Sequence, residues 1–463
     1  MKKKQELKNV MRISVIEGIF AQIHTSLAAI GSNFVTKAAV VLNASPLQFS
    51  LLAGMAQLSQ FFQLYAVLHN KNVSSRKEHC IKFAFWGRLL SIFIGFSFAI
   101  INPQLSFYFF LGLLLISASL QTISGNMWVA WMSDLIPKKI RGRFFSRRMQ
   151  IHLFCGFLVG YIFSFFTDLF EAEVGSIGYR FLEKFNLLRI FNLENLPSGL
   201  TIIFIIGALF GLYGLRLLNK QPERKRQITN NNFELFEPLL DKDFRRLLRF
   251  GLWWMFAIGI GAPFWGPFML RVLKMSLVEM QIYAMLQAIG MLFSFRFWGK
   301  FIDRFGNKTA MKICVLLGTI NPLLWLFFTE SSYSLIWLEG LSSGIMWSGA
   351  NLVTFNFVLS ISPRGKEQHW SAVYSAFTGL MMLVTIMLSG VLYPPKLTIG
   401  NFVLLPEQVL FCLTGVLRLT AEIPLYFVHE AKAVSLRKTI GYGSDYVLAR
   451  LQRLRNMFKI GNL

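Results

Sequence analysis

The chain has 463 residues, of which 54% are hydrophobic and only 15% are charged, and it contains 47 phenylalanines. One soluble core could not bury this much apolar surface, so the composition excludes a water-soluble globular protein and requires a lipid bilayer as a second solvent. The net charge of +24 would suggest nucleic-acid binding in a soluble protein. Most of the basic residues stand between apolar runs, however, and we expect no nucleic-acid partner.

The apolar runs are long enough for membrane-spanning helices, which need roughly 20 residues because a helix pairs its own backbone polar groups in lipid. In the first half, the expected spans are 13–38, 47–68, 81–101, 105–136, 149–169 and 200–218. In the second half, they are 250–272, 278–297, 311–328, 333–361, 370–392 and 402–428. The sequence therefore predicts an all-α integral membrane protein with twelve transmembrane helices.

The placement of lysine and arginine predicts how the chain is oriented. With both termini in the cytoplasm, the basic residues concentrate in cytoplasmic segments, as the positive-inside rule requires. One helix more or fewer would move the basic stretch 138–148 or the linker 219–249 to the other side. We therefore expect an even number of spans. We also expect the protein to lie in a bacterial cytoplasmic (inner) membrane.

The same pattern predicts the domain organisation, with an external loop at 168–199 that includes a short interfacial helix within 181–191. The predicted parts are an N-terminal six-helix half at 1–218, a cytoplasmic linker at 219–249, a C-terminal six-helix half at 250–428 and a basic cytoplasmic tail at 429–463. In the tail, Ser444 can cap an amphipathic helix on the membrane surface, and a frayed basic tail is the equal alternative.

Charged and strongly polar side chains inside a span are costly, so each is a candidate site. The first span carries Glu17 and His24, which lie nearly two turns apart and share a helix face. On a face turned toward a central cavity, a carboxylate and an imidazole can carry protons. The alternatives are a hydrated Glu17 and a His24 that bonds a neighbouring helix. In the second span, Gln57 and Gln60 either line a cavity or join helices.

The fourth and tenth spans contain similar blocks. These blocks are Ser-Gly-Asn-Met-Trp at 124–128 and Ser-Gly-Ile-Met-Trp at 343–347, about half a chain apart, and each span ends at a proline followed by Arg-Gly. A six-plus-six duplication of the helices follows from this spacing.

The loop between the eighth and ninth spans carries Gly299, Asp303, Arg304, Gly306 and Lys308 in the order G-x-x-x-D-R-x-G-x-K. Here the chain resembles the major facilitator superfamily. In such a loop, the first glycine permits close helix packing, the second makes a tight turn, and the aspartate accepts hydrogen bonds from helix N-termini or pairs with a cation. The equivalent loop at 69–82 lacks the aspartate and both glycines.

The resemblance implies a secondary transporter with alternating access and no enzymatic activity, in which small cargo binds between the two halves. The implied cytoplasmic gate combines the five loop residues with Arg141 and Arg364. The implied cavity walls come from matched spans and from the seventh, and they are Asn126, Trp128, Trp131, Trp265, Trp347 and Asn351. Packing or a place in the interfacial belt is the alternative for each tryptophan.

The seventh span cannot form one regular helix, because Gly261, Pro263 and Pro267 interrupt it. We expect a break near Pro263 that forms part of a gate, with a static kink as the alternative. In the last span, Arg418 and Glu422 are spaced to pair on one face, and Glu339 is expected to be hydrated at the external end.

The four cysteines are far apart and form no C-x-x-C pair, so we expect no disulfide framework and no metal site. No Walker A motif occurs, so we expect no ATP-driven pumping by this chain, and coupling to an ion gradient, such as a proton gradient, or simple facilitated exchange remains. We expect no cofactor. Within transport, a lipid flippase or drug exporter remains open, whereas sparse intramembrane arginine disfavours multiply charged anions. A sensor, or a membrane enzyme using His152 or His24 as a base, is a further alternative. We expect a monomer.

Overall fold

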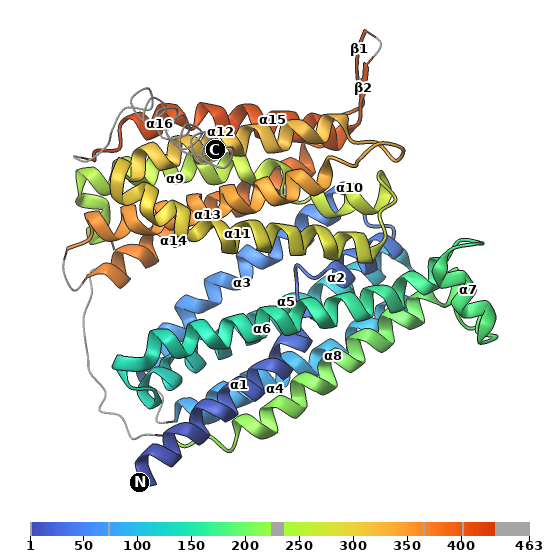
Figure 1. Ribbon diagram of the computed structural model, residues 1–463, viewed down its shortest axis with the longest axis horizontal. Helices are drawn as coiled ribbons and strands as arrows, with labels where there is room; N and C mark the ends of the chain where they lie inside the picture. Colours follow the sequence, from blue (N-terminus) through green and yellow to red (C-terminus); the bar gives the residue numbers. More distant parts are fainter. Residues whose placement is uncertain (1, 73–74, 224–235, 364–365, 401, 431–463) are drawn as a thin grey trace, which may run out of the picture.

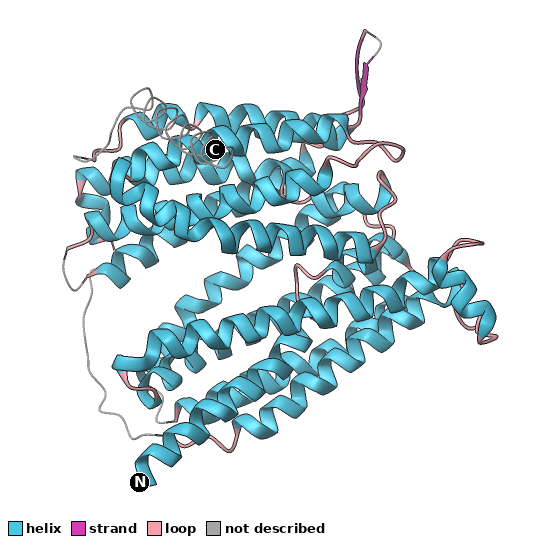
Figure 2. Ribbon diagram, viewed as in Figure 1, coloured by secondary structure: helices cyan, strands magenta, loops and turns pink. Residues whose placement is uncertain are grey.

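The computed structural model describes residues 2–72, 75–223, 236–363, 366–400 and 402–430. The described part is almost entirely helical, as Figure 2 shows. The predicted tail helix from Ser444, and most of the tail, lie outside the described residues.

The first half contains α1 to α8. Their bounds are α1 Lys2–Ala28, α2 Asn33–Val41, α3 Pro46–Asn72, α4 Arg76–Phe93, α5 Pro103–Leu135, α6 Lys138–Asp168, α7 Ile177–Lys184 and α8 Leu196–Leu218. A short 3-10 helix, Ile94–Ala99, continues α4. The short external helix α7 therefore begins before the predicted segment 181–191.

The second half contains α9 to α16 and one small hairpin. Their bounds are α9 Lys242–Gly261, α10 Trp265–Arg271, α11 Leu277–Phe305, α12 Asn307–Leu324, α13 Ile336–Ile361, α14 Glu367–Val391, α15 Pro406–Thr420 and α16 Glu422–Tyr426. The strands β1 Leu397–Ile399 and β2 Phe402–Leu404 pair antiparallel. Because α9 begins at Lys242, its first turns lie inside the predicted linker.

Within the described residues, eleven helices or joined helix pairs are long and apolar enough to cross a membrane. The remaining predicted span corresponds to α3, whose 27 residues would extend about 40 Å at 1.5 Å per residue. It packs against α5 and α14 inside the bundle. The predicted helical membrane fold is confirmed.

The two halves share one hydrophobic core at the end that carries α7 and the β1–β2 hairpin, which we call the hairpin end (right in Figure 1). Side chains from both halves meet there, including Phe34 and Phe204 of the first half and Phe268 and Phe411 of the second. At the opposite end, where α8 ends and α9 begins, which we call the linker end, each half has its own core. The halves are therefore packed together at the hairpin end and separate at the linker end.

The turn between α11 and α12 depends on Gly306. Its φ of 89° lies in the left-handed region, which glycine adopts without steric cost. Residue 306 ends α11 and directly precedes α12. The chain thus reverses here in a single residue.

Helix α11 begins with a complete capping box, in which the Ser276 hydroxyl accepts from the Glu279 N–H and the Glu279 carboxylate accepts from the Ser276 N–H. The Tyr333 hydroxyl donates to the same carboxylate at 3.0 Å. Burial and this carboxylate raise the pKa of Tyr333, so the phenol remains a hydrogen-bond donor.

Candidate functional site

A cluster of charges lies buried in the first half. Glu17 on α1 is 3% exposed, and its two carboxylate oxygens face Arg88 on α4 at 3.5 Å and Arg148 on α6 at 3.7 Å. The hydration alternative for Glu17 is therefore wrong. The carboxylate is held between two guanidinium groups from two other helices.

Each guanidinium is also anchored to a backbone carbonyl. Arg88 Nη1 donates to the Gly211 carbonyl of α8 at 2.5 Å, and Arg148 Nε donates to the Ser14 carbonyl of α1 at 3.1 Å. Gly211 makes this approach possible, because a Cβ there would lie 2.9 Å from Arg88 Cδ. The lack of a side chain at Gly211 on α8 thus leaves room for the long Arg88 side chain of α4.

Trp128 on α5 completes one side of the cluster. The Arg148 guanidinium lies 4.1 Å from the centre of its ring, a cation–π arrangement. The indole Nε1–H is buried and has no hydrogen-bond partner among the described residues. The ring therefore orients Arg148 and leaves one donor unused.

These side chains line a cavity of about 160 Å³ inside the first half, formed by α1, α4, α5, α6 and α8. Its polar lining consists of Glu17, Arg88, Arg148, Trp128, Gln121 and Ser124. Glu17 is the only acidic residue in that lining. The cavity combines two cations, one carboxylate and neutral hydrogen-bonding groups.

His24 does not pair with Glu17. Its Nε2 lies 3.0 Å from the Ser91 hydroxyl on α4, which lies 3.5 Å from the hydroxyl of Ser117 on α5. The ring is fully buried. It thus belongs to a hydrogen-bonded chain across helices, beside the charged cavity and outside its lining.

A second polar cluster occupies the other half. Glu339 on α13 is 3% exposed and accepts from the Tyr283 hydroxyl of α11 at 2.7 Å. Gln287 donates to that hydroxyl and to Ser343. The expectation of a hydrated Glu339 is wrong, because α11 and α13 pack closely enough to enclose the first turn of α13.

The expected pair of Arg418 and Glu422 does not form. The helix is interrupted at Ala421, between α15 and α16, and Glu422 lies 3.7 Å from Lys312 instead. Arg418 donates to the Gly318 carbonyl at 3.0 Å and lies 5.8 Å from the ring centre of Trp347. The break at Ala421 removes the helical register that the i, i+4 spacing assumed.

The remaining cavity-wall candidates lie in different environments. Trp131 is buried and donates to the Pro222 carbonyl at 3.0 Å, and Trp265 stacks on Phe411 with a centroid distance of 3.8 Å. Gln57 approaches Gly379 of α14. The side chain of Asn126 is partly exposed, and the side chains of Gln60 and Asn351 are exposed. Trp131 thus lies inside the core of the first half, and the half-buried Trp265 packs against the core that the two halves share.

The predicted gate residues keep their described contacts within their own halves. Lys308 donates to the Tyr426 and Val428 carbonyls, and Arg141 donates to the Ser133 carbonyl. Asp303 is exposed, and no hydrogen bond or ion pair of its carboxylate is found within the described part of the chain. Arg364 lies outside the described residues.

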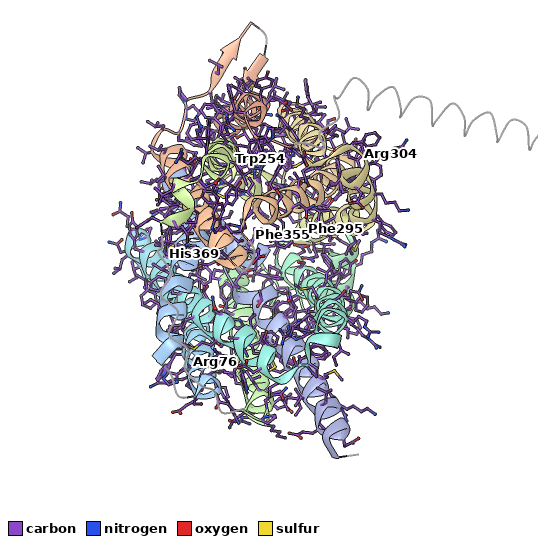
Figure 3. All side chains as sticks on the ribbon, turned by 90° about the vertical axis from the view of Figure 1, so that its left-hand side faces the viewer. Arg76, Trp254, Phe295, Arg304, Phe355 and His369 are labelled. Atoms are coloured by element: carbon purple, nitrogen blue, oxygen red, sulfur yellow. The ribbon has the colours of Figure 1, made fainter. Side chains whose placement is uncertain are left out.

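The N-terminus of α12 is capped by an unpredicted residue. The Glu430 carboxylate accepts from the backbone N–H groups of Asn307 and Lys308 at 2.8 and 2.6 Å. Seen from the linker end in Figure 3, Arg304 of the same loop lies at the periphery of the second half, whereas Trp254 lies among its helices. The loop at 299–308 therefore braces the second half against its own C-terminal segment.

Direct polar contact between the halves occurs at the hairpin end. Asp168, the last residue of α6, accepts from the backbone N–H groups of Leu277 and Val278 at 2.8 and 2.9 Å. These are the first two residues of α11, where free N–H groups and the helix dipole favour an anion. The first half thus caps a helix of the second, which we call the Asp168 latch.

The interrupted seventh span also lies at this contact. Helix α9 ends at Gly261, and α10 begins at Trp265. At Gly266, a Cβ would lie 3.0 Å from Thr36 Cγ2 of α2. The segment after the interruption therefore packs directly on the first half.

Sequence reasoning missed Arg88, Arg148 and Asp168 as site residues. Arg148 stood before the predicted fifth span, and the earlier start of α6 carries it into the bundle. Arg148 stands one position before an apolar run, so it can belong to the span and pair with an acid buried in a neighbouring helix. This position is the signal that could have identified it. The partner of Asp168 lies far along the chain and has no such signal.

Comparison with known proteins identifies the family. The model of the Major Facilitator Superfamily matches residues 18–386, and a search of curated proteins finds no significant match. A crystal structure of the nucleoside transporter NupG is 12% identical, with a TM-score of 0.67 over 92% of this chain and 100% of that chain.

Two sugar-transporter structures are similar in the same way. The D-xylose–proton symporter is 14% identical, with a TM-score of 0.66 over 92% of this chain and 98% of that chain. The inward-open xylose transporter XylE from E. coli is 14% identical, with a TM-score of 0.61 over 93% and 98%. Identities this low establish a shared fold, and the family match covers most of the chain. The chain therefore belongs to the major facilitator superfamily of membrane transporters.

Proposed function

We propose that this protein is a secondary transporter that moves a small polar solute across a bacterial cytoplasmic membrane by alternating access. The observation that carries the proposal is the asymmetry of its packing. One core joins the halves at the hairpin end, whereas separate cores hold each half at the linker end. Rocking the halves would exchange the closed end for the open one, while each half keeps its own core.

Several contacts between the halves would change during this motion. They include the Asp168 latch, the packing of α6 on α11, the packing of α3 on α14 and the contact of α10 with α2. The paired helices belong to different halves. In the proposed cycle, residues 1–218 and 250–428 move as two bodies with both termini in the cytoplasm.

We further propose that Glu17 carries the coupling proton. Its carboxylate is buried and lies between two arginines at 3.5 and 3.7 Å, longer than hydrogen-bond distance. Protonation would remove its attraction for both guanidinium groups and change the polar contacts among α1, α4 and α6. Such a group can link proton binding to the arrangement of helices.

A flippase or drug exporter is supported less well. Phe295 and Phe355 are exposed, and Figure 3 places them, with His369, where the second half faces the first. They provide apolar surface, but the cavity in the first half is lined by charged and amide groups. Polar cargo fits that lining better than an entirely apolar molecule.

Uptake by proteoliposomes tests the coupling. Wild-type protein would be offered a pooled metabolite library with and without an inward proton gradient and compared with Glu17→Gln. We expect gradient-driven accumulation by wild type and only exchange by the variant, because the amide cannot carry a proton. Gradient-driven accumulation that survives in Glu17→Gln contradicts the coupling role.

Cross-linking tests the alternating-access motion. In a variant with the four native cysteines replaced, Gly160→Cys and Gln281→Cys would bring two thiols together between α6 and α11, because a Cβ at Gly160 lies 2.8 Å from the Gln281 amide. Oxidation should stop transport and reduction should restore it. The two single-cysteine variants are the controls, and full transport by the oxidised double variant would contradict the proposed motion.

A further inference from the structure

We propose that the cavity in the first half binds the carboxylate of a monovalent organic anion, held by Arg88 and Arg148. This inference rests on the proposed transport function and names its substrate class. It starts from the charges around the cavity. Two guanidinium groups face one carboxylate, and Glu17 is the only acidic residue in the cavity lining.

Arginine stays protonated in proteins and offers five N–H donors, so the cluster carries one unneutralised positive charge. Arg88 is 8% exposed, and the side chain of Arg148 is 15% exposed. An unneutralised charge at this depth is costly unless an anion joins it. One added carboxylate neutralises the cluster, whereas a dianion would leave a negative charge in its place.

The guanidinium groups have donors to spare for such a ligand. Arg88 makes one hydrogen bond to Gly211, and Arg148 makes one to Ser14. Their distances to Glu17 are too long for good hydrogen bonds. A ligand carboxylate can therefore accept from both arginines without displacing either backbone anchor.

The rest of the cavity favours an organic anion over a bare ion. Its volume of about 160 Å³ is on the order of ten times the roughly 10–15 Å³ that a cavity needs to hold one water. The unpartnered Trp128 Nε1–H, the Gln121 amide and the Ser124 hydroxyl supply neutral polar contacts. A cationic cargo would meet like charge here, and a neutral cargo would leave the cluster unneutralised.

Binding to the purified full-length protein tests the inference. Thermal stabilisation would be measured with a panel of small monocarboxylates, the matching primary amides and a short dicarboxylate, at constant chloride concentration. We expect one or more monocarboxylates to stabilise the wild type and their amides to have no effect. Amides that bind as tightly as the acids overturn the proposal, as does saturation by chloride alone.

Variants locate the site. Arg148→Gln should weaken monocarboxylate binding at least tenfold, whereas Arg147→Gln, which removes an exposed charge one residue earlier on α6, should leave it unchanged. Equal losses in the two variants overturn the proposal. Arg148→Lys keeps the positive charge and replaces the glutamine variant if that variant fails to fold. We expect Arg148→Lys to lose less than half of the binding free energy that Arg148→Gln loses.

Glu17→Gln should strengthen monocarboxylate binding and move the preference toward the dicarboxylate.

The outcomes separate this inference from the transport function. Accumulation of a neutral solute by both wild type and Arg148→Gln would keep the transporter and remove the anion site. Carboxylate binding that depends on Arg148, without flux in proteoliposomes, would keep the anion site and remove the transporter.

Discussion

At the scale of single residues, each half contains an arginine anchored to the backbone of a neighbouring helix. Arg88 of α4 donates to Gly211 of α8, and Arg418 of α15 donates to Gly318 of α12. Under the six-plus-six duplication, α4 corresponds to α12 and α8 to α15. The two halves therefore join equivalent helices by the same kind of bond, with the arginine on opposite members of the pair.

The first prediction concerns Arg88. Arg88→Gln should lower the free energy of unfolding by about 3 kcal/mol, because it leaves the buried Glu17 carboxylate with one of its two cations. The double variant Arg88→Gln with Glu17→Gln should recover part of the loss. Thermal unfolding in detergent would measure both, with the exposed Arg216→Gln on α8 as control. A loss in Arg88→Gln no larger than in the control contradicts a structural role for the pair.

At the scale of helices, the repeated Ser-Gly-x-Met-Trp blocks differ in environment. Gly344 on α13 faces the backbone of Gln287 on α11 so closely that a Cβ would overlap the carbonyl, whereas a Cβ at Gly125 on α5 would meet no atom within 4 Å. Gly125 lines the cavity instead. The sequence similarity of the blocks therefore marks duplication, and only the second glycine is needed for close helix packing.

The second prediction uses this difference. Gly344→Ala should destabilise the protein by about 1–3 kcal/mol, because overpacking must push α11 and α13 apart. Gly125→Ala is the matched control, and we expect no measurable loss of stability from it. The melting temperatures of the two variants in detergent decide the point. Equal melting temperatures would mean that the α11–α13 contact tolerates a methyl group.

At the scale of the whole molecule, the described polar contacts that hold the halves together lie at the hairpin end. The family resemblance implies a gate at the loop 299–308, which lies at the linker end. In this conformation, Lys308 of that loop donates to carbonyls of its own half, whereas the Asp168 latch joins the two halves.

The third prediction concerns the Asp168 latch. Asp168→Ala should shift the equilibrium roughly tenfold toward opening at the hairpin end, because two charge-assisted hydrogen bonds to α11 are lost. Thiol labelling of a cysteine at position 160 would report the opening as a faster reaction. The control is Glu173→Ala, which removes an exposed carboxylate from the adjacent loop. Unchanged labelling in Asp168→Ala contradicts the latch.

The sequence by itself determined the membrane class, the positions of the helices and the family. Runs of apolar residues must span the bilayer wherever they occur, and the Gly299 to Lys308 motif is local, so both can be recognised without a structure. Local chemistry also predicted Glu17 as a site residue. The apolar run of the fifth span begins at 149, so hydropathy alone leaves Arg148 outside the bundle, whereas α6 begins at Lys138.

Only the tertiary structure decided which side chains meet. Glu17, Arg88 and Arg148 come from three helices, and no local pattern pairs residues across such separations. The break at Ala421 separated Arg418 from Glu422, and the packing of α11 on α13 buried Glu339. Side-chain contacts between helices depend on the rotation and depth of each helix, which hydropathy leaves undetermined.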